Sequence, residues 1–268
     1  MDTILDMDFP TEASIRSHLT AYPNDLNYIY LKMLLSINQR EKGSRDRVYN
    51  VLRWLLYCQR PLEVIELFNA VFYNYSLDLS REIDHDEMAK IINRSCLHLI
   101  VVERTSANIL RTNTLLTVRF RHKSAIDFIY NYHSDTSWES RNNADVALRL
   151  SEIKDSASSN AYLARSCLAC IERHFQSFDA NDYQNLPTFE KPSSGFFEYS
   201  AIYWIDHSLQ ANSDLLVDEI LTFAQSDNFR LWVRKFMESR TRIDSLKVIA
   251  HLDNMIQPRS TPTGPPFW

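Results

Sequence analysis

Glycine is scarce in this chain of 268 residues and occurs only at Gly43, Gly195 and Gly264. The usual share is about 7%, so the chain disfavours architectures that depend on many tight turns. Two nucleotide-binding loops are also excluded, because a P-loop needs two nearby glycines before Lys-Ser or Lys-Thr and a dinucleotide fingerprint needs three. Any nucleotide that matters to this protein must therefore be held mostly by another domain or chain.

The chain also lacks the marks of export and of membrane insertion. Its first residues, M-D-T-I-L-D-M-D-F-P, are acidic, and it contains no run of about 18 uncharged apolar residues. Four cysteines are too few for a disulfide framework in so long a chain. These features predict a cytoplasmic protein with reduced thiols and no membrane partner. With a net charge of −5, the molecule has no bulk attraction to nucleic acid.

Apolar residues make up 45% of the chain and recur mostly at helical spacing, which predicts a mainly α fold. A leading helix is expected at 25–37, and a second helix is expected to be capped by Ser44. A third helix would carry Pro61 in its first turn. A fourth would start with a capping box formed by Asp84 and Glu87.

Two segments with strand character follow these helices. Residues 97–102 are β-branched and apolar, and 116–120 alternate apolar side chains with Thr and Arg, so a hairpin around a polar loop is expected. Three helices followed by a hairpin is the order of a winged helix, whose third helix would be the recognition helix. Carboxylates near the start of that helix would face phosphate, which disfavours duplex binding through it: Asp78, Glu82, Asp84, Asp86 and Glu87.

At His122 the alternating pattern changes to helical spacing, and a helix from Ser124 leaves the hairpin at once. Further helices are expected at 144–153, 158–178, 195–210, 214–225, 229–240 and 243–255. The predicted organisation is an N-terminal segment with the leading helix at 1–40, a winged-helix domain at 41–133, an all-α helical domain at 134–257 and a Pro-rich tail at 258–268. A polar linker at 134–143 separates the two domains.

Several segments, in this order, resemble the region that follows the NACHT domain in fungal STAND-type NTPases, signalling proteins that often continue into ankyrin or WD repeats. They span roughly residues 24 to 210 and read N-D-L-N-Y-I-Y-L-K-M-L-L-S-I, V-L-R-W-L-L-Y-C-Q-R-P-L-E-V-I-E-L, I-I-N-R-S-C-L-H-L-I-V-V, V-R-F-R-H-K-S-A-I-D-F-I, Y-L-A-R-S-C-L-A-C-I and F-F-E-Y-S-A-I-Y-W-I-D-H-S-L-Q-A. The resemblance implies a winged helix followed by a helical domain, with the P-loop on sequence before Met1.

The resemblance further implies a non-catalytic module for signal transduction. It would couple a NACHT-type NTPase domain to a C-terminal sensor or repeat domain through protein–protein contacts. This chain alone would hold no cofactor, whereas the NACHT domain would bind ADP and ATP, or GTP. Enzymatic activity is not expected of the chain itself, because no serine, cysteine or histidine lies in a recognised nucleophile motif.

His122 is the main candidate site residue. In related switch NTPases a histidine at the end of the winged-helix hairpin, often within Met-His-Asp, contacts bound ADP. The matching positions here are Arg121, His122 and Lys123, so the histidine is kept while its neighbours differ. The resemblance thus implies nucleotide sensing by His122, with Arg121 and Lys123 as phosphate or domain contacts. An imidazole N–H at a helix N-terminus is suited to donate to phosphate. The alternative is a histidine that only forms hydrogen bonds at a strand-to-helix corner.

Other patterns have simpler interpretations. Cys167, Cys170 and His174 have metal-ligand spacing, but they lie in an apolar helical run where buried small side chains are expected. The acidic run at 82–87 is explained by capping and by the helix dipole, and no metal site is expected there. The aromatic residues between 196 and 204 are expected to form core.

Two alternative functions stay open. One stretch is locally basic and would suit a winged-helix nucleic-acid-binding protein that uses its wing; it contains Arg94, Arg104, Arg111, Arg119, Arg121 and Lys123. Nucleic acid is nevertheless the less expected partner, because the acidic helix start opposes it. The other alternative is a stand-alone adaptor that binds a protein through its helical half.

Overall fold

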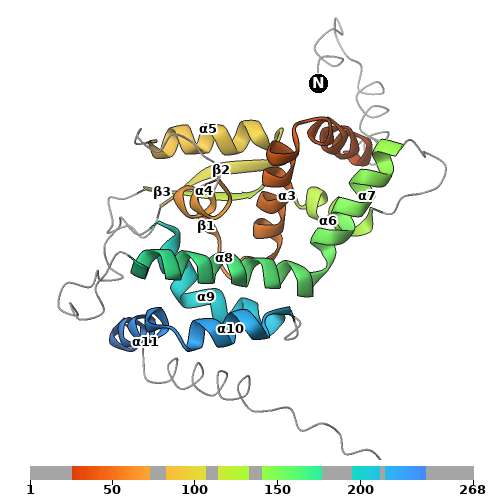
Figure 1. The fold of residues 1–268 in the computed structure, drawn as a ribbon. Coiled ribbons are helices and arrows are strands. Elements are labelled where there is room, and N and C mark those ends of the chain that lie inside the picture. Colours follow the sequence, from red (N-terminus) through yellow and green to blue (C-terminus); the bar gives the residue numbers. More distant parts are fainter. Residues whose placement is uncertain are drawn as a thin grey trace, which may run out of the picture.

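The computed structural model describes residues 26–72, 83–106, 114–132, 141–176, 195–211 and 215–239. These residues are mainly helical and include one small antiparallel sheet (Figure 1), which confirms the mainly α class. Most of the N-terminal segment, most of the predicted linker at 134–143, the helix predicted at 243–255 and the Pro-rich tail lie outside the described residues.

The first half of the chain contains a leading helix, three further helices and three strands. In order these are the helix at 26–38, α3 (Lys42–Tyr57), β1 (Leu62–Glu63), α4 (Val64–Phe72), α5 (His85–Ser95), β2 (Ile100–Ser106) and β3 (Thr114–Phe120). The Asp84 cap predicted for α5 is confirmed, because its carboxylate accepts the Glu87 N–H at 2.7 Å.

The start of α3 differs from the prediction. Ser44 does not cap this helix, which begins at Lys42 and encloses Gly43 and Ser44 in its first turn. Its first turn closes when the Arg45 N–H donates to the Glu41 carbonyl at 3.0 Å. A glycine inside a helix costs only about 1 kcal/mol relative to alanine, so Gly43 alone does not delay the start.

The predicted start of the third helix is also wrong. Leu62 and Glu63 form β1, and α4 begins only at Val64. Leu62 pairs with Val118 and Glu63 pairs with Thr117 in antiparallel register. A strand of two residues shows no alternation of its own, so the sequence gives no local signal for it. The pairing places β3 at the centre of a sheet with the order β1-β3-β2.

The predicted hairpin is confirmed as β2 and β3, which pair from Ile100↔Phe120 to Ser106↔Thr114. The first strand begins later than expected because Leu97 and His98 form a turn between α5 and β2. Both have positive φ angles, 45° and 65°. This left-handed conformation is uncommon for residues other than glycine.

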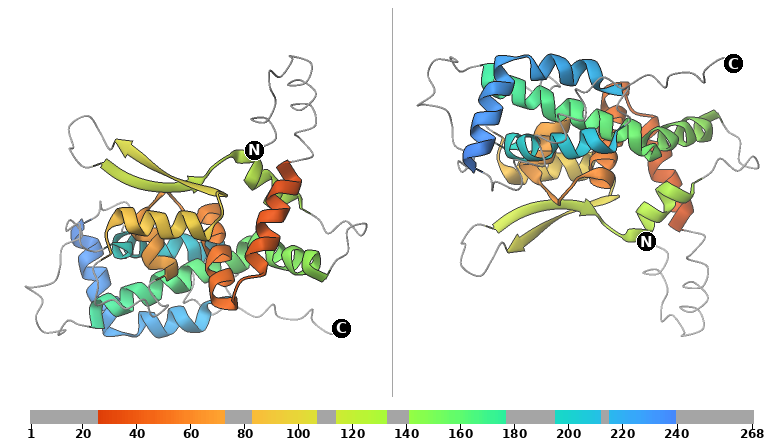
Figure 2. Two further views of the ribbon diagram at one scale, coloured as in Figure 1. Left: turned by 90° about the horizontal axis from the view of Figure 1, so that it is seen from above. Right: turned by 90° about the horizontal axis from the view of Figure 1, so that it is seen from below.

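The second half of the described chain is helical throughout. It contains α6 (Lys123–Asn131), α7 (Arg141–Lys154), α8 (Ser156–Gln176), α9 (Phe196–Gln210), α10 (Val217–Ala224) and α11 (Asp227–Ser239). Helices α8 and α9 pack closely together, and α10 and α11 lie on the side away from the sheet (Figures 1 and 2). Among these described helices, none has both the length and the apolar content needed to cross a membrane.

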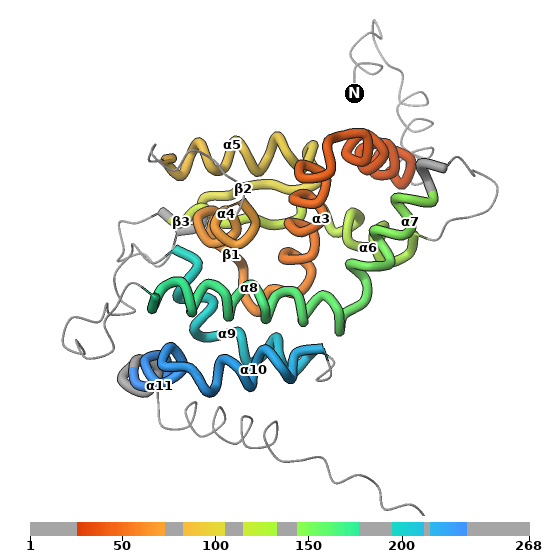
Figure 3. The backbone as a smooth tube through the Cα atoms, in the orientation of Figure 1, coloured from red at the N-terminus to blue at the C-terminus, as the bar shows by residue number. Residues whose placement is uncertain are grey.

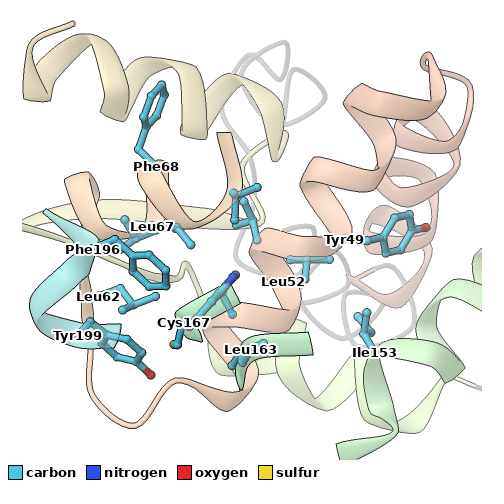
Figure 4. Packing of buried hydrophobic residues seen from close by; sticks show 14 of the residues in the cluster. Tyr49, Leu52, Leu62, Leu67, Phe68, Ile153, Leu163, Cys167, Phe196 and Tyr199 are labelled. Atoms are coloured by element: carbon cyan, nitrogen blue, oxygen red, sulfur yellow. The ribbon is translucent and has the colours of Figure 1, made fainter. Parts of the chain in front are cut away.

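One hydrophobic core joins the two halves of the described chain. Helix α3 lies between α4 and α7 (Figure 3). Figure 4 shows Leu52 and Leu62 from the first half beside Leu163 and Phe196 from the second. Trp54 of α3 is fully buried, and loss of such a side chain typically costs about 3–5 kcal/mol.

The aromatic residues of α9 lie in this core, as expected from the sequence, and those that are buried are Phe196, Phe197, Tyr199 and Trp204. Trp54 meets the rings of Phe196 and Tyr199 edge-on, with centroids 5.2 and 5.7 Å apart. Edge-to-face packing of this kind adds about 0.5–1.5 kcal/mol beyond burial. Helix α9 is therefore fixed against α3.

Candidate functional site

His122 lies at the corner where β3 ends and α6 begins, as the change of pattern predicted. It is the N-cap of α6 and keeps an extended backbone, with φ −146° and ψ 147°. The Ser124 N–H donates to its Nδ1 at 3.1 Å, and the Ala125 N–H donates to its carbonyl at 3.1 Å. The imidazole of His122 therefore caps α6, a role that Ser, Thr, Asp or Asn usually has.

The cap determines which nitrogen of His122 carries the proton. A backbone N–H can only donate, so Nδ1 must be the acceptor and the neutral ring carries its hydrogen on Nε2. His122 is exposed. The corner therefore presents an N–H donor, and its natural complement is an acceptor such as a phosphate or carboxylate oxygen.

Two residues that the sequence did not single out support this histidine. Ser124 Oγ lies 2.7 Å from His122 Nδ1, and the Tyr30 hydroxyl lies 2.7 Å from Ser124 Oγ. Tyr30 is in the leading helix and is buried, with its ring 5.6 Å from that of Phe128 in α6. The sequence predicted Ser124 only as the start of the helix, which begins one residue earlier at Lys123, and Tyr30 carries no local signal of its distant partner.

The Arg121 side chain forms a hydrogen bond with the turn between α5 and β2. Its Nε donates to the His98 carbonyl at 3.1 Å, and its backbone N–H donates to the Leu99 carbonyl at 3.0 Å. These bonds hold the turn that contains the two positive φ angles. Lys123 is exposed at the first residue of α6. Of the two predicted contact residues, Arg121 thus has a structural task at this corner.

Carboxylates partly neutralise the basic stretch around the hairpin. The Arg119 guanidinium on β3 makes a bidentate pair with Glu103 on β2; Nε donates to Oε2 at 2.6 Å, and Nη2 also donates to Oε1. Arg104 lies 4.0 Å from the carboxylate of Asp86 on α5. Arg111 lies outside the described residues. This arrangement weakens the attraction of the hairpin for a phosphate backbone.

The cysteines of the C-x-x-C pattern contribute to packing, as the sequence indicated. Cys167 and Cys170 are free thiols on α8, and burial raises the pKa of both, so they stay protonated. The His174 ring stacks on Phe197 of α9 with centroids 3.7 Å apart. Among the residues that the structure describes, no three His, Cys, Asp or Glu side chains come together as a metal site; Glu82 lies outside that set.

A second histidine, His207, lies in a buried chain of hydrogen bonds that the sequence did not reveal. The Gln59 N–H donates to the Tyr199 hydroxyl oxygen at 2.9 Å, and Tyr199 lies 2.9 Å from His207 Nε2. His207 Nδ1 lies 2.9 Å from Asn160 Oδ1, and Asn160 Nδ2 donates to the Ser156 carbonyl at 2.9 Å. We call these residues the buried relay.

Proton positions in the buried relay follow from its fixed ends. The Asn160 oxygen can only accept, so His207 carries its hydrogen on Nδ1 and Nε2 accepts from the Tyr199 hydroxyl. Every group is then satisfied with a neutral imidazole. His207 is fully buried, and burial lowers its pKa to about 4. The relay joins the end of α3 to α8 and α9.

An ion pair with a buried carboxylate and a half-buried guanidinium lies beside the relay. Arg60 Nη1 and Nη2 donate to Glu66 Oε2 and Oε1 at 2.7 and 2.6 Å, and the Glu63 N–H donates to Glu66 Oε2 at 2.9 Å. The Arg60 guanidinium also lies over the ring of Tyr199, 5.3 Å from its centroid. The pair connects β1 and α4 to α9 and therefore reinforces the junction made by the relay.

Comparison of the chain with models of protein families, with curated proteins and with solved structures gave no significant match. Two features of the structure bear most directly on function. The corner at His122 offers a fixed donor to solvent, and the buried relay at His207 locks the two halves of the described chain together. Both features join elements that lie far apart in the sequence.

Proposed function

We propose that this chain is a non-catalytic regulatory module of a STAND-type signalling NTPase. It would couple a NACHT-type nucleotide-binding domain to a C-terminal sensor or repeat domain, such as an ankyrin array. The order α3-β1-α4-α5-β2-β3, with an antiparallel sheet ordered β1-β3-β2, supports assignment of this part as a winged helix. The short strand β1 adds to the three helices and hairpin expected from the sequence.

The observation that carries the proposal is the exposed donor at His122, immediately after the last strand of that sheet. In switch NTPases related to the family that the sequence resembles, a histidine at the end of the winged-helix hairpin contacts ADP. An Nε2–H at a helix N-terminus suits a phosphate oxygen, because the neighbouring backbone N–H groups and the helix dipole also favour an anion. Nucleotide would be held mainly by the NACHT domain, with His122 as a contact from this module.

A coupling module must move as one rigid body. Contacts between the two halves of the described chain support such rigidity. The common core, the buried relay and the Arg60–Glu66 pair connect the sheet-containing half to α8 and α9. Rigid-body rotation of such a unit is one of the standard ways in which a change at a ligand site reaches a distant surface.

Duplex binding by the hairpin is the weaker alternative. The acidic start of α5 and the pairing of Arg119 with Glu103 both oppose phosphate contact. A protein-binding role for the helical half has a specific observation in its favour. Leu209, Leu215 and Val217 are exposed where α9 ends and α10 begins, and Leu209 is 54% exposed. This surface suits the sensor side of the proposed module as well as a stand-alone adaptor.

The test uses a parent protein in which a NACHT-type NTPase domain is joined to this chain, and it measures ADP affinity by titration with a fluorescent ADP analogue. We expect His122→Ala to weaken ADP binding about tenfold or more, because a hydrogen bond to a charged group contributes about 1.5–3 kcal/mol, and to raise basal signalling. His85→Ala is the matched control, since His85, like His122, is an exposed histidine at the N-terminal end of a helix.

Unchanged ADP affinity together with unchanged basal signalling in His122→Ala would overturn the proposal. A gene in which no NTPase domain precedes Met1 in frame would also count against it and would favour the adaptor. Salt-dependent binding of duplex DNA by the chain would favour the nucleic-acid alternative.

A further inference from the structure

We propose that Tyr30 and Ser124 are positioning residues for His122, and that through them the leading helix fixes which imidazole nitrogen the corner presents. The ligand in this inference is the ADP of the proposed function, so the effect on ADP binding rests on that proposal. The positioning itself is a property of this chain alone and is testable without nucleotide.

The direction of each hydrogen bond in the chain Tyr30–Ser124–His122 is determined by the backbone. Because the Ser124 N–H donates to His122 Nδ1, that nitrogen has no hydrogen of its own. The Ser124 hydroxyl, 2.7 Å away, must then donate to the same nitrogen. With its hydrogen used, Ser124 Oγ can only accept from the Tyr30 hydroxyl at 2.7 Å. The Tyr30 phenol thus orients the Ser124 hydroxyl, and the two Ser124 donors together hold the imidazole.

Tyr30 is fixed to the leading helix and to α6 at the same time. Its ring packs on Phe128 of α6, and the same helix buries Leu34 and Ile37 in the common core. A shift of the leading helix against α6 would therefore separate the Tyr30 hydroxyl from Ser124. Such a shift would leave the Ser124 hydroxyl without the donor that orients it, so its hydrogen bond to His122 Nδ1 would weaken. The ring would then exchange between its two neutral tautomers and between rotamers.

In the proposed module, these contacts link the position of the leading helix directly to the donor at His122. In the proposed parent protein the leading helix would lie between the NTPase domain and the sheet in sequence order. A movement of that domain that displaces the helix would therefore weaken the donor at His122. Nucleotide contact and helix position would then depend on each other in both directions, as linkage requires.

The same chain contains its own reference for the experiment. His207 is held in the opposite tautomer, with its hydrogen on Nδ1, by Asn160 and Tyr199. The two histidines are linked to different elements: His122 to the leading helix, and His207 to α8 and the end of α3. A perturbation of Tyr30 should change the signals of the first and leave those of the second.

The experiment records long-range 1H–15N spectra of the full chain labelled with 15N-histidine at pH 8, where ordinary histidines are neutral. We expect the wild type to show His122 with its hydrogen on Nε2. Ser124→Ala should shift both ring nitrogens of His122 toward the values of a tautomer mixture, and Tyr30→Phe should shift them in the same direction by less. The matched controls are Tyr28→Phe, an exposed tyrosine of the same helix, and Ser151→Ala, an exposed serine of α7.

Three outcomes decide the inference, once the backbone amide spectrum shows that each variant is folded. A shift in Ser124→Ala and Tyr30→Phe, with unchanged His207 signals and silent controls, supports it. Wild-type His122 with its hydrogen on Nδ1 would overturn it, and so would identical His122 signals in wild type, Ser124→Ala and Tyr30→Phe.

ADP titration of the parent protein separates this inference from the proposed function. If both hold, Tyr30→Phe weakens ADP binding, and the double variant with His122→Ala binds within about twofold of His122→Ala alone, since residues in one network are not additive. Additive losses would overturn the positioning role. If His122→Ala leaves ADP affinity unchanged while the tautomer shift is present, the proposed function fails and the positioning role stands.

Discussion

Protonation of His207 should destabilise the fold in mildly acidic solution. The imidazole is fully buried, and every partner in the relay requires it to be neutral. Burial lowers its pKa to about 4, against about 6.5 for an unfolded chain. Between these two values the unfolded state binds more protons than the folded state. The stabilising contribution is therefore complete above pH 6.5 and is lost as the pH falls toward 4.

The size of this effect follows from the same two pKa values. Their separation corresponds to roughly 3 kcal/mol, of which about 2 kcal/mol should be lost by pH 5. A domain is typically stable by about 5–15 kcal/mol, so the loss is a large share of the total. A charged His207 would also place a second N–H donor against Tyr199, whose hydroxyl would have to turn and lose its present acceptor.

The assay is urea unfolding of wild type and His207→Gln between pH 7.5 and 4.5. Glutamine does not titrate, so the difference between the two removes the effect of groups that they share, such as His174, whose pKa burial also lowers. We expect the variant to be about 1–3 kcal/mol less stable than wild type at pH 7.5. Near pH 5 this difference in the free energy of unfolding should vanish or change sign. Asn160→Ala is the control, because it breaks the relay and keeps the imidazole; its stability should still fall with pH.

Two results would refute this reasoning. The first is a stability difference between wild type and His207→Gln that stays constant over the pH range. The second is an Asn160→Ala variant whose pH dependence matches that of His207→Gln, because the titrating group would then not be His207.

Two further predictions concern the junction of α4 and α9. Gly195 has a φ of +48°, and a Cβ there would lie 2.5 Å from Asn69 Nδ2, so Gly195→Ala should cost about 2 kcal/mol in thermal unfolding. Adding Asn69→Ala should restore the steric part, and a Gly195→Ala protein as stable as wild type would contradict the contact. Glu66→Gln should cost about 3 kcal/mol, the low end for a broken buried pair, because the Arg60 side chain is 30% exposed. The matched change Asp227→Asn breaks an exposed pair and should cost under about 1 kcal/mol; equal losses in the two would show that burial does not matter.

Sequence patterns predicted the long elements well, because their signal is local. The five described helices after α6 begin and end within three residues of the predicted ranges, and the hairpin and the corner at His122 were both found. The strand β1 was missed because two residues cannot show a period, and its partner Val118 lies far along the chain. The prediction of Ser44 as a cap was wrong because it rested on residue type alone. Serine after glycine is common at helix starts, but here the backbone is already helical at Gly43 and Ser44.

The polar contacts at the two histidines were largely beyond sequence analysis. Tyr199 and His207 lie in a segment whose aromatic content indicates core, and that content hides a hydrogen-bonded pair. Asn160 and Gln59 look like ordinary surface residues, since nothing in their neighbourhood marks them as partners. Burial and pairing depend on how helices pack, and packing is decided by contacts between residues remote in sequence.

The position of Trp54 has a consequence for the history of the gene. Its ring meets Phe196, Tyr199 and His207 edge-on. The core around the first half of the chain is therefore completed by side chains from the second half. A recombination event near residue 133 would pair Trp54 with a foreign surface and separate the relay from its partners. An exchange that carries 26–239 as one block keeps all these contacts. We therefore expect the two halves to be inherited together, and shuffling to occur only outside that block.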